Sequence, residues 1–330
     1  MDRCFMEYRK LGRTGLKVSA LCLGTMTFRW TSTEAESFQV LDRAWDSGIN
    51  FLDTADIYSN WAANNPGGVS EEIIGRWMQN KPRDQIILAT KCRGRMGEGP
   101  NAEGLSRAHI LNAVNHSLRR LKTDYIDLYQ VHWPDWDTPL EETLRTLDDL
   151  VRQGKVRYLG ASNFQAWYLM KALGISERLG LAHFASIQPH FHLLNRREVE
   201  PELALLCLNE GVGMIPYSPL ASGFLTGKYT REGGVPQGSR GGGAARYMHD
   251  KGWAVVDALR AMGQKRSKTP AQMALAWHFS LPFITAPIIG ANNIPQLDEL
   301  LGAVGTTFSS EEMQQLDQMT DTSRNYRDDD

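Results

Sequence analysis

Short apolar stretches alternate with amphipathic stretches along nearly the whole chain. The apolar stretches have the length of buried strands, and the amphipathic ones repeat with the period of a helix. The sequence predicts eight strands, at Leu21–Gly24, Asn50–Asp53, Ile86–Thr90, Ile126–Val131, Arg157–Ala161, Ala185–Gln188, Gly213–Tyr217 and Pro287–Gly290. It predicts helices at Thr33–Asp46, Ser70–Gln79, Ser106–Leu121, Leu140–Gln153, Ala166–Leu173, Glu198–Glu210 and Gln296–Val304. This alternation is typical of a parallel α/β sheet that closes into a (β/α)8 TIM barrel.

Three segments stand outside the repeat. Tyr8–Leu11 and Lys17–Ala20 flank a Thr-Gly turn and predict an N-terminal β-hairpin. A long glycine-rich loop is expected over 223–247, read either as a surface loop or as a clasp over a ligand. An extra helix over Ser309–Met319 begins with a Ser309/Glu312 capping box, and Thr33 with Glu36 gives the same signal earlier. No shift in composition marks a boundary, so one domain over 1–330 is expected.

Charge and composition limit the class of partner. The 330 residues include 36 basic and 38 acidic side chains, so no basic excess points to nucleic acid. No apolar run reaches the length of a membrane helix, and the N-terminus lacks the apolar core of a signal peptide. The four cysteines are scattered, as in proteins of a reducing compartment. We expect a cytoplasmic protein that acts on a small molecule.

Polar residues follow the ends of most of the expected strands. In a parallel barrel these ends share one face, where active sites are built. In chain order the residues are Asp53, Lys91, His132, Ser162, Asn163, Gln188, Tyr217, Ser218 and Gly290. Tyr58 follows Asp53 by five residues and should lie over the same opening. Any one of them alone could be a turn or cap residue, but their joint placement predicts a site.

Several spaced motifs carry a family resemblance. Phe51 to Tyr58, with Ser70 to Gly75 after it, looks like a signature of the aldo-keto reductases. Further blocks at 140–144, 154–164 and 217–229 continue the match in the same order. The chain thus resembles the aldo-keto reductase family, in the branch of potassium-channel β-subunits and bacterial general aldo-keto reductases. The resemblance extends roughly from Tyr8 to Met319.

The resemblance implies an NAD(P)H-dependent reduction of aldehydes or ketones. It places Asp53, Tyr58, Lys91 and His132 in a catalytic tetrad. It implies contacts with the nicotinamide cofactor for Gly24, Thr25, Met26, Asp53, Ser162, Asn163, Gln188, Tyr217, Ser218, Pro219, Leu220, Ala221, Gly223, Lys228, Arg240, Ile289, Gly290, Ala291, Asn292, Gln296 and Glu299. No Gly-x-Gly-x-x-Gly turn follows the first strand, so a Rossmann site is not expected.

The four tetrad side chains suit the chemistry of carbonyl reduction. Hydride must come from a cofactor, and a side chain must supply the proton. A lysine ammonium about 4 Å from the Tyr58 phenol contributes up to about 4 kcal/mol at an effective dielectric constant of 20. We therefore expect Lys91 to lower the pKa of Tyr58 toward the working range, while Asp53 holds Lys91 and His132 orients the carbonyl.

The substrate and the cofactor type are specified less closely. Trp30 and Trp133, together with Tyr58 and His132, should contact an apolar or ring-bearing carbonyl compound. Trp61 and Trp136 either join them or only pack the loops. NADP(H) is favoured, with NAD(H) as the alternative, because Lys228 and Arg240 could meet its phosphates whereas Asn292 brings no cation.

The sequence is also compatible with two other functional classes. One is a regulatory protein of the same fold that binds nicotinamide nucleotide as a sensor. The other is a metal-dependent barrel hydrolase, for which His190 and His192 are the best candidate ligands. Metal sites of that kind need further ligands on other strands, so we expect no metal site.

Overall fold

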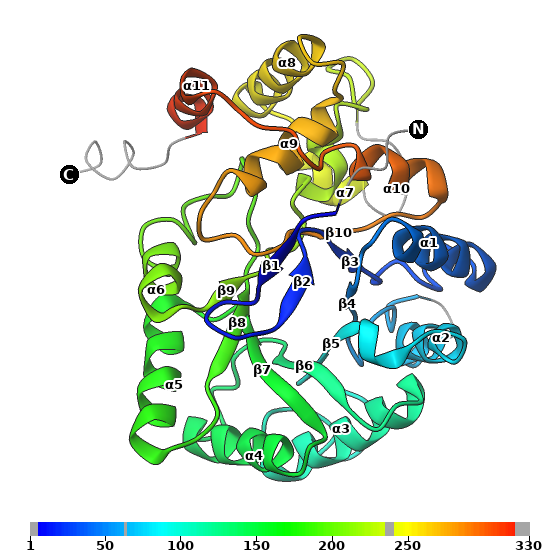
Figure 1. Cartoon of the computed structure of the whole chain (residues 1–330), viewed down its shortest axis with the longest axis vertical. Helices are drawn as coiled ribbons and strands as arrows, with labels where there is room; N and C mark the ends of the chain where they lie inside the picture. The colour runs from blue at the N-terminus through cyan, green and yellow to red at the C-terminus, as the bar shows by residue number, and fades with distance from the viewer. Residues whose placement is uncertain (1–5, 63–64, 235–240, 321–330) are drawn as a thin grey trace.

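Eight parallel strands form the centre of the protein, in a computed structural model that describes residues 6–62, 65–234 and 241–320. The strands, in chain order, are β3 (Cys22–Gly24), β4 (Phe51–Asp53), β5 (Ile87–Cys92), β6 (Ile126–Val131), β7 (Val156–Ser162), β8 (Phe184–Gln188), β9 (Gly213–Met214) and β10 (Ile288–Ile289). From β3 to β8 each strand pairs with the next along the chain, and β10 pairs with β3. Thr285 and Ile288 donate backbone hydrogen bonds to Met214 and Pro216, which closes the sheet between β9 and β10. The expected TIM-type barrel is confirmed (Figure 1).

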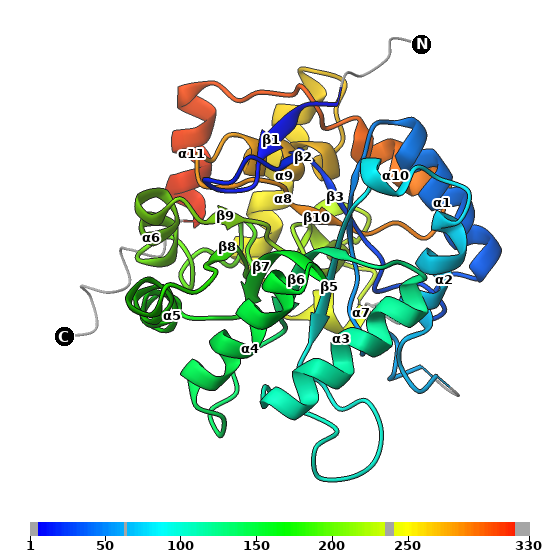
Figure 2. The same cartoon turned by 60° about the horizontal axis from the view of Figure 1, so that its bottom comes forward.

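Helices surround the barrel on its outer side (Figures 1 and 2). They are α1 (Glu34–Asp46), α2 (Val69–Met78), α3 (Arg107–Leu121), α4 (Leu140–Arg152), α5 (Ala166–Leu179), α6 (Leu203–Glu210), α8 (Asp250–Gln264), α9 (Pro270–Phe279), α10 (Ile294–Leu301) and α11 (Ser310–Thr320). The predicted capping boxes are present at Thr33/Glu36 and Ser309/Glu312. No helix within the described residues combines the length and apolar character needed to span a membrane.

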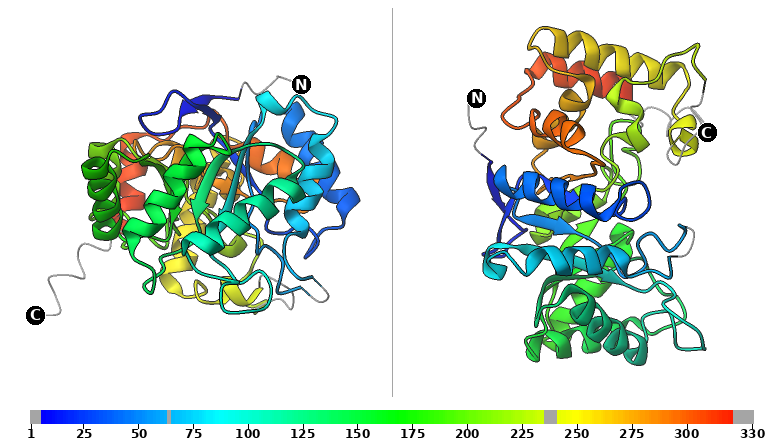
Figure 3. Two further views of the ribbon diagram at one scale, coloured as in Figure 1. Left: turned by 90° about the horizontal axis from the view of Figure 1, so that it is seen from below. Right: turned by 90° about the vertical axis from the view of Figure 1, so that its right-hand side faces the viewer.

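An antiparallel hairpin covers the amino-terminal end of the barrel. It consists of β1 (Tyr8–Lys10) and β2 (Lys17–Ser19), as the sequence predicts. Leu11 and Val18 are fully buried with Phe51 and Leu128 of the barrel strands. Figure 3 shows the hairpin at one end of the molecule and α7 (Gly241–Ala245) toward the other. The carboxyl ends of the strands therefore form the open face.

The structure departs from the predicted elements in several places. Lys91 lies inside β5 rather than just beyond it, and the last strands are shorter than expected. α6 begins at Leu203 rather than Glu198, since residues around Pro201 form turns. α8 and α9 were not predicted. The glycine-rich segment 223–247 is not all loop, because it contains α7 and overlaps the 3-10 helix η2 (Ala221–Thr226).

The cysteines with described positions, Cys22, Cys92 and Cys207, are buried free thiols. Cys4 lies outside the described residues. The reducing, cytoplasmic compartment expected from the sequence stays a prediction.

Candidate active site

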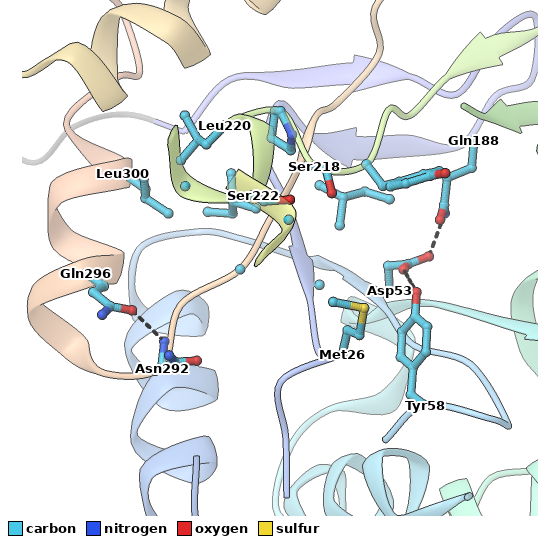
Figure 4. Close-up of a pocket in the computed structure, with 18 of the residues that line it drawn as sticks. Met26, Asp53, Tyr58, Gln188, Ser218, Leu220, Ser222, Asn292, Gln296 and Leu300 are labelled. Carbon is cyan, nitrogen blue, oxygen red and sulfur yellow. Dashed lines mark hydrogen bonds between the residues drawn. The ribbon is translucent and has the colours of Figure 1, made fainter. Parts of the chain in front are cut away.

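Lys91 is the centre of a buried charged network at the open end of the barrel. Its Nζ donates to Asp53 Oδ2 at 2.6 Å, to the Tyr58 hydroxyl oxygen at 2.7 Å and to the Thr54 carbonyl at 2.9 Å. The Tyr58 hydroxyl in turn donates to Asp53 Oδ2 at 3.3 Å (Figure 4). The Lys91 and Asp53 side chains are 0% and 1% exposed. The structure thus brings together three of the residues that the sequence singled out.

Local backbone structure brings Tyr58 over Lys91. Asp53 is the last residue of β4, and a turn closed by the Tyr58 N–H and the Ala55 carbonyl follows. The next residue, Ser59, has a φ of 66°, and its hydroxyl donates to the carbonyls of Met26 and Phe28. These bonds tie the Tyr58 loop to the loop after β3. The phenol is thereby held over the barrel opening rather than left on a free surface loop.

The second carboxylate oxygen of Asp53 faces two glutamine amides. Gln188 Nε2 donates to Oδ1 at 2.8 Å, and Gln130 Nε2 donates to it at 3.1 Å. Gln188 was predicted as a site residue, whereas Gln130 was missed. The available signal was a lone amide within the apolar run of β6, since a buried amide must find hydrogen-bond partners.

Burial determines the protonation of this network. It raises the pKa of Tyr58 well above that of free tyrosine, and the negative charge of Asp53 raises it further. Burial also lowers the pKa of Lys91, against the opposing effect of Asp53. The burial of Tyr58 and the charge of Asp53 outweigh the lowering expected from Lys91, so the predicted shift of the Tyr58 pKa toward the working range is wrong for the resting site. Tyr58 is a protonated phenol there, and Lys91 is its hydrogen-bond donor.

His132 joins the network from the end of β6. Its ring lies edge-on to the Tyr58 ring, with centroids 5.9 Å apart. Burial and the nearby charge of Lys91 hold the pKa of His132 well below its usual range, so the imidazole is neutral. Its Nδ1 is buried without a hydrogen-bond partner among the described residues. A neutral imidazole beside the phenol can exchange a hydrogen bond with a polar ligand atom through a ring nitrogen that faces it.

A cavity of ≈ 720 Å³ opens above this network. Most of the predicted cofactor positions line it, as do Trp30, Tyr58, His132 and Trp133. The lining positions among the cofactor set are Gly24, Met26, Asp53, Ser162, Asn163, Gln188, Tyr217, Ser218, Pro219, Leu220, Gly223, Lys228, Ile289, Gly290, Asn292, Gln296 and Glu299. The site prediction did not include five further lining residues, Ser222, Thr226, Gly243, Ile288 and Leu300.

A few predicted positions do not line the cavity. Thr25, Ala221 and Ala291 are buried behind its wall, and the Thr25 hydroxyl donates to the Asp53 carbonyl. Lys91 is also behind the wall and acts on the cavity through Tyr58. Arg240 lies outside the described residues.

Polar groups at the ends of β7 and β8 hold one another near Asp53. The Ser162 hydroxyl donates to the Gln188 carbonyl at 2.8 Å. The Asn163 amide donates to the His132 carbonyl, and its oxygen accepts from the Tyr217 hydroxyl at 3.0 Å. The Tyr217 ring is stacked on His190, with centroids 5.2 Å apart. An oriented aromatic face and several amides therefore border the cavity close to the network.

The far end of the cavity is formed by the loop after β10 and by α10. The backbone N–H of Asn292 donates to Gln296 Oε1 (Figure 4). The Thr31 hydroxyl donates to Asn292 Oδ1. Glu299 lines the same end. Lys228 is the one lysine or arginine among the described lining residues. The cavity is therefore long and polar at both ends, with little cationic character over its described part.

Aromatic side chains form the remaining wall. Trp30 and Trp133 line the cavity, as predicted. Trp61 does not line it, but packs edge-on against Trp30 with centroids 5.5 Å apart. Trp136 lies outside the cavity, stacked on Trp167. The two tryptophans left open by the sequence thus pack the loops around the wall.

His190 and His192 have other partners. His192 Nε2 lies 2.9 Å from the Tyr247 hydroxyl, and His190 Nδ1 lies 3.1 Å from the Asn195 amide. Within the described ranges, no three His, Cys, Asp or Glu residues are grouped so that they could hold a metal ion. The geometry gives the hydrolase alternative no support.

Known proteins resemble the chain over nearly its full length. The pattern of the Aldo/keto reductase family matches residues 20–321. Versiconal hemiacetal acetate reductase of Aspergillus parasiticus is 37% identical, over 95% of this chain and 96% of that protein. The uncharacterized oxidoreductase YrpG of Bacillus subtilis is 37% identical over 94% and 95%, and a probable voltage-gated potassium channel subunit beta of Arabidopsis thaliana is 37% identical over 91% of each chain. The fold, the motifs and these relatives agree that the chain belongs to the aldo/keto reductase family.

Proposed function

We propose that the protein, acting as one domain over 1–330, reduces aldehydes or ketones to alcohols with a nicotinamide cofactor and with Tyr58 as the proton donor. The observation that carries this proposal is the buried contact of Tyr58, Lys91 and Asp53 beneath the cavity. A neutral phenol held 2.7 Å from an ammonium can release its proton once a stronger base appears beside it.

The cavity residues fit a nicotinamide cofactor. Ser162, Asn163 and Gln188 would hold the carboxamide, Tyr217 would stack on the ring, and Lys228 would meet the phosphates. Gly223 has a φ of 88°, and a Cβ there would lie 3.2 Å from Lys228 Nζ, so a side chain would crowd the lysine. When bound, the reduced nicotinamide supplies the hydride.

The residues of the chain handle the proton. Tyr58 and His132 border one side of the cavity, where together they can bind and orient a carbonyl oxygen. As the carbonyl carbon gains hydride, its oxygen becomes strongly basic and takes the Tyr58 proton. Lys91 then stabilises the tyrosinate, and Asp53 keeps the lysine charged and in place.

The aromatic wall indicates the substrate class. Met26, Trp30 and Trp133 border the cavity beside Tyr58. Large apolar faces next to a proton donor favour an apolar or ring-bearing carbonyl compound.

We propose NADP(H) as the preferred cofactor, with NAD(H) as the alternative. The ammonium of Lys228 favours a ligand rich in phosphate charge. Asn292, Gln296 and Glu299 at the far end bring no positive charge. Dissociation constants for both reduced cofactors, measured by quenching of tryptophan fluorescence, decide between them.

The proposal is tested by measuring the oxidation of NADPH and of NADH with 4-nitrobenzaldehyde as the substrate. Tyr58→Phe should lower kcat by about 10²–10⁴-fold, since one general acid contributes about that much. The dissociation constant of the cofactor should change little, and Tyr8→Phe, at an exposed tyrosine of the hairpin, is the matched control. Full activity of Tyr58→Phe would remove this residue from the mechanism. Tight cofactor binding without turnover by the wild type would instead favour a nucleotide-sensing role.

A further inference from the structure

Gln130 lies in a closed hydrogen-bond ring inside the barrel. It is fully buried on β6. Its Nε2 donates to Asp53 Oδ1, and its Oε1 accepts from Gln188 Nε2 at 3.3 Å. Gln188 Nε2 also donates to the same Asp53 oxygen. Two amides and one carboxylate oxygen therefore satisfy one another without solvent.

The ring allows one orientation of the Gln130 amide. Reversing it would place Gln130 Oε1 against the Asp53 carboxylate and its Nε2 against the amide nitrogen of Gln188. Both contacts would be repulsive. The observed orientation gives Asp53 Oδ1 two amide donors and leaves Oδ2 to Lys91 and Tyr58.

The neighbouring strand makes room for this side chain. Gly160 on β7 is the register partner of Gln130, and Lys91 on β5 is its partner on the other side. A Cβ at position 160 would lie 3.0 Å from Gln130 Cγ and 2.7 Å from Ser186 Oγ. Both contacts are too close for an unstrained fit, so the glycine leaves the space that Gln130 occupies.

We propose that Gln130 is a positioning residue, which keeps the Asp53 carboxylate turned so that Oδ2 serves Lys91 and Tyr58. This proposal rests on the reductase function proposed above. Gln130 does not line the cavity, so it acts on the reaction through Asp53 and through Gln188. Loss of its amide donor frees the Asp53 carboxylate to turn, and Lys91 and Tyr58 then lose their alignment beneath the cavity.

The first test compares kcat with the dissociation constant of the reduced cofactor for Gln130→Met, which keeps the length of the side chain and removes its amide. One hydrogen bond to an ionised group corresponds to about a tenfold change in an equilibrium. The kcat should therefore fall about tenfold, while the cofactor dissociation constant changes much less. Gln130→Glu, which places a carboxylate against Asp53, should lower kcat further. Tyr129→Phe is the matched control, because Tyr129 is buried on the same strand but faces the layer beneath the helices.

The second test needs no turnover. In protein labelled with 13C-carboxyl aspartate, the Asp53 signal is identified by its loss in Asp53→Asn, and its chemical shift at one fixed pH is compared between wild type and Gln130→Met. A moved Asp53 signal in the variant supports the proposal, and an unchanged signal overturns it. An equal loss of kcat and of cofactor affinity also overturns it, by leaving Gln130 a merely structural role. Gly160→Ala, which presses on Gln130 without removing it, gives the same comparison if Gln130→Met does not fold. Absence of wild-type turnover would count against the reductase function alone.

Discussion

Removal of the Lys91 charge should cost the protein stability as well as activity. Lys91→Met keeps an unbranched side chain in the barrel but removes three hydrogen bonds, at 2.6, 2.7 and 2.9 Å. The Thr54 carbonyl loses this donor, and Asp53, only 1% exposed, loses its cation. Removing one partner of a buried ion pair costs about 3–5 kcal/mol of unfolding free energy, because the other charge stays buried.

Neutralising Asp53 in the same chain should recover much of that loss. In Lys91→Met with Asp53→Asn, no unpaired charge remains, and the main residual cost is the Thr54 carbonyl, about 1–3 kcal/mol. The double variant should therefore be more stable than Lys91→Met alone, with a coupling energy of about 2–3 kcal/mol between the two sites.

The assay is equilibrium unfolding in urea, followed by circular dichroism and by tryptophan fluorescence so that coincident transitions support a two-state treatment. Arg43→Met with Asp298→Asn is the control cycle, since this pair is 2.6 Å apart but its side chains are 42% and 44% exposed. Its coupling should stay below about 1 kcal/mol. If the losses of unfolding free energy in the two single variants at Lys91 and Asp53 are additive, burial does not strengthen the interaction between these side chains.

Three further predictions concern other parts of the structure. Burial lowers the pKa of His278 to about 4 from an ordinary 6.5, so the unfolded chain binds this proton more readily. The unfolding free energy should therefore fall by about 3 kcal/mol as the pH is lowered from 6.5 to 4. Urea unfolding over this pH range should show a smaller fall for His278→Gln than for the wild type. Gly75→Ala should lower the unfolding free energy by about 1–3 kcal/mol, because its Cβ would lie 2.2 Å from the Arg120 carbonyl. Gly174→Ala, with open space around it, should instead raise it by about 0.5–1 kcal/mol. Lys228→Met should weaken binding of both reduced cofactors about tenfold in the fluorescence titration, and an unchanged affinity would place the phosphates elsewhere.

The site residues were predictable where their position along the chain alone determines which end of the barrel they occupy. Asp53 ends β4 and His132 follows β6, and the ends of parallel strands share one face. Gln130 was not predictable in the same way. Both faces of β6 are buried, so the sequence does not show which residues face the barrel interior.

The helices α8 and α9 were missed for different physical reasons. In α9, every residue from Ala271 to His278 except Gln272 is buried, so no polar face reveals a helical period. The Thr269/Gln272 capping box with Pro270 was the remaining signal. In α8 the buried positions, among them Trp253, Val256 and Leu259, do follow a helical period. The hydrophobic pattern alone could therefore have predicted α8.

The pKa of Tyr58 shows what position alone cannot supply. From the sequence, a lysine beside a phenol predicts a lowered pKa, since only the charge enters the argument. In the structure the phenol is also buried and faces Asp53, and both effects raise the pKa. The direction of the pKa shift follows from the burial of Tyr58 in the barrel, and that burial depends on packing by segments distant in the sequence.

The hairpin is one of these distant segments. Leu11 and Val18 close the amino-terminal end of the barrel with Phe51, Leu128 and Ile215, in an apolar cluster below the charged network. Water is thereby excluded from beneath Asp53 and Lys91, and a low dielectric strengthens every contact that their charges make. The same exclusion makes each charge costly without its partner. The hairpin, which contributes no residue to the cavity lining, therefore helps to set both the strength of the network and its dependence on Gln130 and Gln188.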